Sequence, residues 1–564
     1  MLVILDGGVS RQARAVFQKP RAVIGADRPD EVPGALAALE AALAGGAHVA
    51  GWLGYELGYA LEPRLAPHAR GPAGGALLRL GVFGPPEPGL PEPVGRAYAG
   101  PLRLGWDAPA YARAFAEVKA FIAAGDIYQA NLSFRAAFPF AGEPRALYET
   151  LRAASGAGHC AFVDDGARQI VSLSPELFFE LTDGIFTVRP MKGTARRLGD
   201  DAAERARLAT SAKDRAENLM IVDLIRNDLA RLAESGSVAV PRLFEIETYP
   251  TLHTMVSTVT ARKRPGVGAG DILRALFPCG SVTGAPKIRA MEILHALEAG
   301  PRGPYCGAIG HFAPDGSARF NVAIRTLTIT GGRGELGIGG GVVQDSDAAR
   351  EYDECRLKAR FFEAARRPLE LIETLRFENG FIRMEAHLDR MAKSAPVFGL
   401  AFDAGAARAA LQEAVAGRRG PSRVRLTLDE AGRHKASAHD LAPDPSHWTY
   451  ALSRARTHSA DLLLRHKTNW RDLYDGEAAR AETDEILFTN ERGELTEGAR
   501  SNVFVRRGDE LLTPPLAAGL LPGCLRAALI AQGKAREAVL YPADLEGEVL
   551  LGNSLRGLIA ARRA

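Results

Sequence analysis

The chain has 564 residues, too long for one ordinary domain, and this length predicts about three or four structural units. Its 70 lysines and arginines nearly balance its 67 aspartates and glutamates, which argues against a nucleic-acid or membrane-surface partner and favours a small-molecule ligand. The cysteines form no CxxC pair, and no apolar run approaches about 18 residues, so we expect a cytoplasmic protein without disulfides, thiolate zinc or a membrane span.

Proline and glycine gather between about Gly71 and Pro101, which marks loops at the end of an N-terminal segment, residues 1–100. Helical periodicity then alternates with short β-rich runs, as in residues 111–124 and 169–173. This mixture predicts an α/β or α+β fold. The pattern restarts with a strand after Pro368, so we place a boundary at about residue 367, between domains of residues 101–366 and 367–564.

Lys192 stands between a proline turn and a glycine in the stretch Arg189–Thr194. A lysine whose pKa is lowered by burial is a usable nucleophile, although most lysines are solvated surface groups. Its neighbours in the sequence therefore decide between the two interpretations.

Two pairs of acidic residues are spaced three apart on predicted helices: Asp214 with Glu217, and Glu351 with Glu354. This spacing puts both carboxylates of a pair on one helix face, so two such helices could converge on one cation. Hard oxygen ligands suit Mg²⁺. The alternative for each pair is a solvated charged face.

Seven blocks of sequence in a fixed order resemble the chorismate-utilising enzymes, over about residues 100–362. The blocks are Gly125–Leu132, Ser174–Glu176, Pro190–Thr194, Lys213–Asn218, Asp223–Asp228, Gly280–Lys287 and Gly339–Gly341. The resemblance implies a large fold of packed sheets with helices around one cleft.

The resemblance also implies roles for individual residues. Glu217 and Glu354 would ligate Mg²⁺, with Asp214 and Glu351 supporting them through water. Arg325 would bind a second substrate carboxylate, together with backbone groups near Thr283, Gly284 or Gly340. His253 would line the pocket for the substrate ring, although a lone histidine is more often structural.

Within these enzymes, position 192 separates two activities. Anthranilate synthase carries alanine there, whereas the aminodeoxychorismate synthase large subunit carries lysine. Lys192 would add to carbon 2 of chorismate as the carbon 4 hydroxyl leaves, and ammonia would then enter at carbon 4 and expel it. Glu176 would protonate the leaving hydroxyl and later act as a base. This step needs no redox cofactor.

The resemblance implies a protein partner. Neither half shows the Cys-His-Glu pattern of a glutamine amidotransferase, so ammonia would come from a separate amidotransferase subunit. The N-terminal segment lacks the Leu-Leu-Glu-Ser block of a tryptophan pocket, which leaves tryptophan binding open.

The last 200 residues contain a second set of blocks, around Lys467, Arg390, Glu497, residues 519–524 and Ser554. Taken alone, the block around Lys467 predicts only a basic turn. Together the blocks resemble the fold-type IV pyridoxal-phosphate enzymes, which include class IV aminotransferases and aminodeoxychorismate lyase.

On that resemblance, Lys467 would hold the cofactor as a Schiff base and Glu497 would keep the pyridine nitrogen protonated. Arg390, Ser554 and the backbone from Leu521 to Cys524 would bind the phosphate. A homodimer through this domain is one expectation.

The fusion suggests consecutive steps: amination of chorismate, then pyridoxal-phosphate-dependent release of pyruvate to give 4-aminobenzoate. The fold alone does not decide between elimination and transamination. The alternative is an anthranilate synthase large subunit fused to an unrelated aminotransferase.

Overall fold

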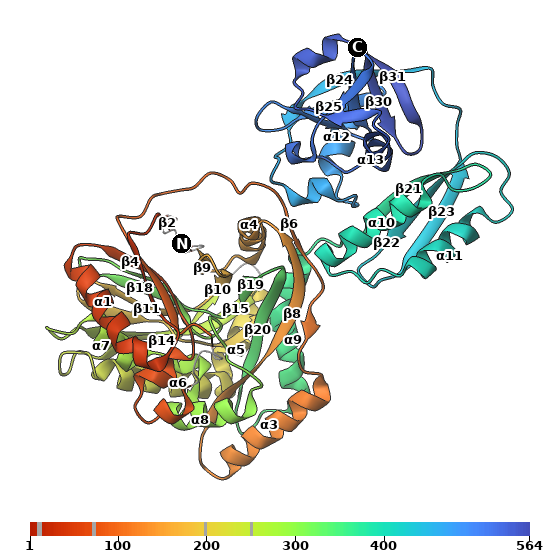
Figure 1. Ribbon diagram of the computed structural model, residues 1–564. Helices are drawn as coiled ribbons and strands as arrows, with labels where there is room; N and C mark the ends of the chain where they lie inside the picture. Colours follow the sequence, from red (N-terminus) through yellow and green to blue (C-terminus); the bar gives the residue numbers. More distant parts are fainter. Residues whose placement is uncertain (8–13, 70–74, 197–199, 249–251) are drawn as a thin grey trace. The chain divides into compact units, whose positions relative to one another are not determined.

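The computed structural model describes residues 1–7, 14–69, 75–196, 200–248 and 252–564 (Figure 1). Contacts divide the chain into two compact units. The first unit consists of Met1–Pro91, Leu102–Phe138 and Tyr148–Ala365, and the second of Glu92–Pro101, Pro139–Leu147 and Arg366–Ala564.

The first unit contains two large sheets. One has the strand order β16-β8-β20-β19-β10-β9-β1-β2, with β7 beside β8. Its strands are β1 (Leu2–Asp6), β2 (Ala15–Gln18), β7 (Arg103–Leu104), β8 (Gln129–Gly142), β9 (His159–Asp164), β10 (Gln169–Ser174), β16 (Gly284–Ala285), β19 (Thr326–Thr330) and β20 (Arg333–Val342). Strands near the N-terminus therefore share a sheet with strands from the catalytic blocks.

The other sheet has the order β13-β15-β12-β11-β18-β17-β4-β5-β3, with β14 also paired to β15. Its strands are β3 (Ala22–Ala26), β4 (His48–Leu53), β5 (Leu78–Phe83), β11 (Leu177–Thr182), β12 (Ile185–Val188), β13 (Met191–Arg196), β14 (Ala239–Thr248), β15 (Leu252–Arg262), β17 (Ala308–Phe312) and β18 (Ala318–Val322). A buried cluster that includes Val3 and Phe17 of the first sheet and Trp52 and Ile309 of the second joins the two sheets face to face.

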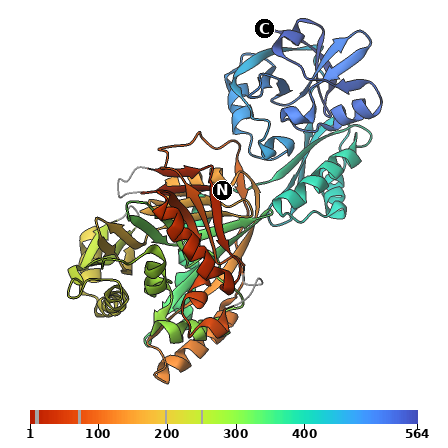
Figure 2. The same cartoon turned by 60° about the vertical axis from the view of Figure 1, so that its left-hand side comes forward.

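Helices cover these sheets. The red helix α1 lies against β3 and β4 (Figures 1 and 2), and its apolar side joins α6 and α7 in a large core with the second sheet. The helices of this unit are α1 (Val32–Ala44), α2 (Leu57–Leu61), α3 (Ala108–Ala123), α4 (Pro144–Ser155), α5 (Asp201–Thr210), α6 (Ala212–Ala230), α7 (Ala269–Leu276), α8 (Lys287–Leu297) and α9 (Ala348–Ala365), of which α4 begins within the second unit.

The second unit has two sheets of its own. The smaller sheet contains β21 (Leu371–Phe377), β22 (Ser422–Leu428) and β23 (His434–Asp440), with α10 (Met384–Ser394) and α11 (Ala404–Val415) packed against it (Figure 2). The strand β6 (Ala97–Ala99) pairs with Phe140–Gly142 at the end of β8. Both β6 and this end of β8 belong to the second unit, whereas β8 up to Phe138 belongs to the first.

The larger sheet has the order β26-β25-β24-β31-β30-β27-β28-β29. Its elements are β24 (His447–Arg456), α12 (Asp472–Arg480), β25 (Glu485–Thr489), β26 (Leu495–Gly498), β27 (Asn502–Arg507), β28 (Glu510–Thr513), α13 (Cys524–Ala531), β29 (Ala535–Glu537), β30 (Val549–Asn553) and β31 (Gly557–Arg563). The mixed helix and sheet composition that the sequence predicted is confirmed. In the described part of the chain, no helix combines the length and apolar character that crossing a membrane requires.

Candidate active sites

Two crossings between the sheets of the first unit bring Glu176 and Arg325 together. The chain leaves β10 for β11 at Glu176, and it returns from β18 to β19 at Arg325. The N–H of Leu173 donates to the carbonyl of Arg325 at 3.1 Å, and the N–H of Val322 donates to the carbonyl of Glu176 at 3.1 Å. Both side chains line a cavity of about 290 Å³.

Glu176 is buried, with 5% of its surface exposed. Burial raises the pKa of its carboxyl to about 7, although a hydrogen bond with Ser281 and the positive charge of Lys192 act in the opposite direction. A carboxyl with a pKa near neutrality can both give and take a proton at neutral pH. Glu176 thus has the chemistry of a general acid and base.

Arg325 has a half-buried side chain without an ion-pair partner among the described residues. Burial lowers the pKa of its guanidinium. A guanidinium in this setting is suited to bind a carboxylate through two parallel hydrogen bonds.

Lys192 reaches the same cavity from β13, where it pairs with Met255 of β15. The register shifts directly after it, at Gly193, whose φ is +79°. A Cβ on Gly193 would lie 2.9 Å from Oδ1 of Asp214, so the bulge and the close approach of α6 both require glycine.

Gln129 lies beside this cavity, and the sequence motifs contained it without singling it out. It is fully buried on β8, and neither its Oε1 nor its Nε2 has a hydrogen-bond partner among the described residues. A Cβ placed on Gly341 would lie 3.1 Å from Gln129 Nε2 and 3.4 Å from Lys192 Nζ, which puts both groups beside one point of the cavity wall. A buried amide without hydrogen-bond partners destabilises the fold unless a ligand supplies those partners.

Four acidic side chains line the cavity from two helices: Asp214 and Glu217 on α6, and Glu351 and Glu354 on α9. Glu351 accepts a hydrogen bond from Ser346 Oγ at 2.8 Å. The three-residue spacing within each acidic pair therefore places both of its carboxylates beside the cavity.

Crowding of these acids affects their protonation. Burial raises the pKa of Glu217; the charges of Lys192 and Lys213 act against this rise, and those of Asp214 and Glu351 act with it. Burial also raises the pKa of Glu351. For Glu354, burial acts to raise the pKa, but nearby lysines, foremost Lys358 at 2.9 Å, hold it below its ordinary value. Repulsion among carboxylates and their hard oxygen atoms are both features that fit Mg²⁺.

Four expected substrate contacts do not line this cavity. His253 is fully buried on β15, with Nδ1 2.9 Å from Thr248 Oγ1 and Nε2 3.4 Å from Asp201 Oδ1. Thr283 donates its hydroxyl to backbone carbonyls, while Gly284 pairs with Ala130 in the first sheet. Their neighbours face the cavity instead: Ser281 and Val282 for the first loop, and Gly339 and Gly341 on either side of Gly340. Substrate roles for His253, Thr283, Gly284 and Gly340 stay predictions.

A second cavity, of about 450 Å³, lies in the second unit around Lys467. Burial lowers the pKa of the Lys467 amine to about 8, and the charges of Arg390 and Arg471 act in the same direction. The carbonyl of Lys467 accepts from the N–H of Ile372 at 2.8 Å, which ties this residue to β21. An amine with a lowered pKa is available for a carbonyl group at neutral pH.

Glu497 lies in the wall of the second cavity on β26. Burial raises the pKa of its carboxyl to about 7, against the effect of hydrogen bonds from Tyr474 Oη (2.8 Å) and the Leu521 N–H (3.2 Å). The Leu521 amide is thus directed at Glu497 rather than at a phosphate. Tyr474 is a second residue that sequence motifs missed.

The expected phosphate ligands are linked by one buried acid, Glu373 of β21. Its carboxylate accepts two hydrogen bonds from Arg390, at 2.9 and 2.6 Å, and lies 2.6 Å from Nδ1 of His387. The other ring nitrogen of His387 lies 2.9 Å from Ser554 Oγ. Glu373 therefore orients Arg390 directly and Ser554 through His387. Burial acts to raise the pKa of Glu373, but the charge of Arg390 and the hydrogen bonds of His387 and Arg390 hold it at about 2.

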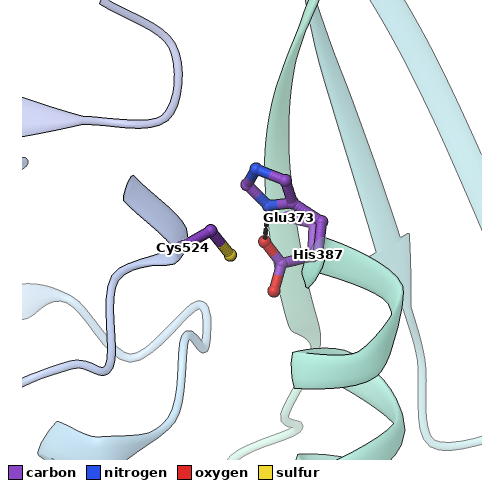
Figure 3. Close-up of side chains that lie close together, drawn as sticks. All are labelled: Glu373, His387 and Cys524. Atoms are coloured by element: carbon purple, nitrogen blue, oxygen red, sulfur yellow. Dashed lines mark hydrogen bonds and ion pairs between the residues drawn. The ribbon is translucent and has the colours of Figure 1, made fainter. Parts of the chain in front are cut away.

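Glu373, His387 and Cys524 have ligand atoms within 4.8 Å of one another (Figure 3), the one such group of three among the described residues. Arg390 already occupies the carboxylate, and burial raises the pKa of the Cys524 thiol to about 11. A protonated thiol beside a guanidinium disfavours a metal ion. The group instead supports the wall of the Lys467 cavity.

The rim of that cavity carries two arginines on β22, Arg423 and Arg425. They are two residues apart and therefore share a face of the sheet. Both are exposed, and neither has an ion-pair partner among the described residues. They give the cavity a positive entrance.

Comparison with known proteins assigns each half of the chain to a family. Residues 86–364 match the family described as chorismate binding enzyme, and residues 370–564 match amino-transferase class IV. The chain is a chorismate-binding enzyme domain fused to a class IV aminotransferase domain. The fusion and the resemblances that the motifs suggested are thereby confirmed.

Relatives of the chorismate-binding domain include enzymes of two kinds. Aminodeoxychorismate synthase component 1 of Klebsiella aerogenes is 47% identical over 249 residues, or 43% of this chain and 55% of that protein. Anthranilate synthase component 1 of Methanothermobacter thermautotrophicus is 41% identical over 246 residues, or 43% of this chain and 53% of that protein. The chain thus spans about half the length of these curated relatives.

A solved structure shares the fold of the first domain. Anthranilate synthase component I from Streptococcus pneumoniae TIGR4 has a TM-score of 0.50 and is 28% identical, covering 56% of this chain and 80% of that chain. Fold alone does not separate aminodeoxychorismate synthase from anthranilate synthase. The residues of the cavity have to do so.

Proposed function

We propose that this fusion makes 4-aminobenzoate in two consecutive steps. The chorismate-binding domain aminates chorismate to 4-amino-4-deoxychorismate, and the class IV domain releases pyruvate from that product. The observation that carries the proposal is that Lys192 lies in one cavity with Glu176 and Arg325. Anthranilate synthase, which adds ammonia at carbon 2, has alanine at the position of this lysine.

In the first step, the Lys192 amine adds to carbon 2 of chorismate as both ring double bonds shift and the carbon 4 hydroxyl leaves. Glu176 protonates that hydroxyl, so that water departs. Ammonia then attacks carbon 4, both double bonds shift back and Lys192 is expelled, while Glu176 accepts the proton that ammonia loses. Two displacements give net retention at carbon 4.

Charged groups of the cavity hold the substrate during this exchange. Arg325 binds one carboxylate. Glu217 and Glu354 would hold Mg²⁺, with Asp214 and Glu351 in support, and the cation would offset the charge of the other carboxylate. Ammonia comes from a separate glutamine amidotransferase subunit, as the component 1 relatives imply by their name.

In the second step, pyridoxal phosphate supplies an electron sink for the amine of the intermediate. Arg390 and Ser554 would hold its phosphate, Lys467 would hold the cofactor through its amine and move a proton of the substrate, and Glu497 would stabilise the protonated pyridine nitrogen. Arg423 and Arg425 bind the carboxylates of the intermediate. Loss of pyruvate as the ring becomes aromatic makes this step favourable.

Product identification tests the proposal. Purified protein, chorismate, Mg²⁺, ammonium and pyridoxal phosphate are incubated together, and the aromatic product is separated by chromatography. We expect 4-aminobenzoate and pyruvate in equal amounts. The ortho isomer would instead identify an anthranilate synthase fused to an unrelated aminotransferase.

Two lysine variants assign the steps. Lys192→Ala should stop ammonia-dependent consumption of chorismate. Lys467→Ala should abolish the visible absorbance of the cofactor and let aminodeoxychorismate accumulate. Lys263→Ala is the control, because this lysine lies outside both cavities at the end of β15 and binds the carbonyl of Val267.

A further inference from the structure

A short segment of the front half of the chain folds into the second unit. Residues Glu92–Pro101 group with the class IV domain, as do Pro139–Leu147. The ring of Tyr98 is fully buried there, in edge contact with Phe398 at 5.3 Å and Trp470 at 6.1 Å. The segment is thus part of the core of the unit that carries Lys467.

Arg96, two residues before Tyr98, makes two hydrogen bonds in this unit. Its Nε donates to Asp461 Oδ2 at 2.9 Å, and one terminal nitrogen donates to the carbonyl of Trp470 at 3.0 Å. The Asp461 side chain is 10% exposed and that of Arg96 is 35% exposed, so this ion pair is partly buried and solvent screens it less than a surface pair. Hydrogen bonds between charged partners are about twice as strong as neutral ones.

The two partners of Arg96 stand at opposite ends of the stretch that carries Lys467. Asp461 precedes the short helix Leu462–Arg465 and caps it by accepting from the Leu463 N–H at 3.0 Å. Trp470 follows Lys467 by three residues. One guanidinium therefore joins the beginning and the end of this stretch.

Gly95 lies against Asp461, where a Cβ would be in ordinary van der Waals contact at 3.4 Å from the Asp461 Cα. Its φ is +95°, so the backbone conformation, and not a lack of space, favours glycine at this position. On its other side, the Lys467 stretch is fixed to β21 through the Ile372 to Lys467 hydrogen bond. β21 and Arg96 together therefore hold Lys467 from two directions, and Arg96 itself lines the cavity.

We propose that Arg96 is a positioning residue for Lys467, so that the cofactor site of the class IV domain is complete only with a segment from the front half of the chain. The inference rests on the proposal that Lys467 holds pyridoxal phosphate, but not on whether elimination or transamination follows. A consequence is that the two activities do not separate by cutting the chain at the domain boundary near residue 366.

The test uses the full chain with Arg96→Ala and Arg96→Lys. Arg103→Ala is the matched control, because Arg103 is an exposed arginine of the neighbouring strand β7 without an ion pair among the described residues. Cofactor-free protein is titrated with pyridoxal phosphate, and the dissociation constant and the pH dependence of the visible band are measured. Chorismate consumption with ammonium and thermal melting are recorded in parallel.

We expect Arg96→Ala to weaken cofactor binding about tenfold or more and to shift the pH dependence of the visible band, since Lys467 loses its fixed position. Arg96→Lys should restore binding in part, because an ammonium group cannot reach both partners as a planar guanidinium does. Consumption of chorismate by the Arg96 variants should be unchanged. The Arg103→Ala protein should keep the cofactor affinity and the band titration of the unaltered protein.

Two results would overturn the inference. One is an Arg96→Ala protein with the cofactor affinity and band titration of the original. The other is a lower melting temperature without any change in the band, which would assign Arg96 a merely structural role. Absence of the band from the unaltered protein would refute the proposed cofactor site itself, and with it this inference.

Discussion

The hydroxyl of Tyr474 donates a hydrogen bond of 2.8 Å to Glu497, the acid expected to face the pyridine nitrogen. Only the ionised carboxylate stabilises a protonated pyridine, and burial raises the pKa of Glu497 to about 7. Because the Tyr474 hydrogen bond counteracts that rise, its loss should raise the pKa further.

Tyr474→Phe should therefore move the acid limb of 4-aminobenzoate formation from aminodeoxychorismate to higher pH, with less activity at pH 7 than the unaltered protein. Glu497→Gln should remove this limb and lower the rate at every pH. Rates from pH 5.5 to 9 check both. Superimposable profiles for the Tyr474→Phe and unaltered proteins would contradict the role of this hydrogen bond.

Glu176 should give the first reaction an alkaline limb. Its protonated form delivers the proton to the leaving hydroxyl, so turnover at a constant concentration of free ammonia should fall as pH rises through about 7. The hydrogen bond with Ser281 lowers the pKa of Glu176, so Ser281→Ala should move the limb to higher pH. Glu176→Gln should lose about 10²- to 10⁴-fold in rate. An unshifted limb in Ser281→Ala would assign it to another group.

The carboxylates of α6 and α9 should make Mg²⁺ binding release protons. Burial raises the pKa of Glu217 and of Glu351, and a bound cation favours their ionised forms. Calorimetry near pH 5 in two buffers of different ionisation enthalpy should therefore show proton release that disappears near pH 8. Glu217→Gln should weaken Mg²⁺ binding at least about tenfold. Asp223→Asn is the control, because Asp223 lies on the same helix but pairs with Arg226 outside the cavity.

Motifs from contiguous residues could be interpreted before the fold was known. Lys192, Glu176, Lys467 and Glu497 each lie in a short block whose residue types indicate chemistry, and each lines the cavity expected of its domain. The class of fold followed from the alternation of helical and strand patterns.

Other site residues depend on contacts between distant parts of the chain. Arg96 reaches Trp470 across 374 positions, and no local pattern marks either residue. The role of Tyr474 depends on its contact from α12 with Glu497 on β26. The position of Gln129 beside the first cavity depends on the approach of Gly341 from another strand. The motif around Gly340 was found, but the alternation of a strand determines which glycine faces the cavity, and here Gly339 and Gly341 do.

The arginines of β22 should determine which substrates the class IV domain accepts. Aminodeoxychorismate carries two carboxylates, whereas a simple amino-acid donor such as alanine carries one. Among the residues that the structure describes, neither Arg423 nor Arg425 has an ion-pair partner, so each can bind an anion at the cavity rim without breaking an existing ion pair.

Replacing either arginine by alanine should raise the KM for aminodeoxychorismate about tenfold or more, with a smaller change in kcat, because these contacts form in the bound substrate as well as in the transition state. Arg419→Ala is a suitable control, since this exposed arginine precedes the same strand outside the cavity. Cofactor absorbance should remain at its original intensity in all three variants. A loss confined to kcat would place the arginines in the chemical step, and an unchanged KM would show that the substrate carboxylates bind elsewhere.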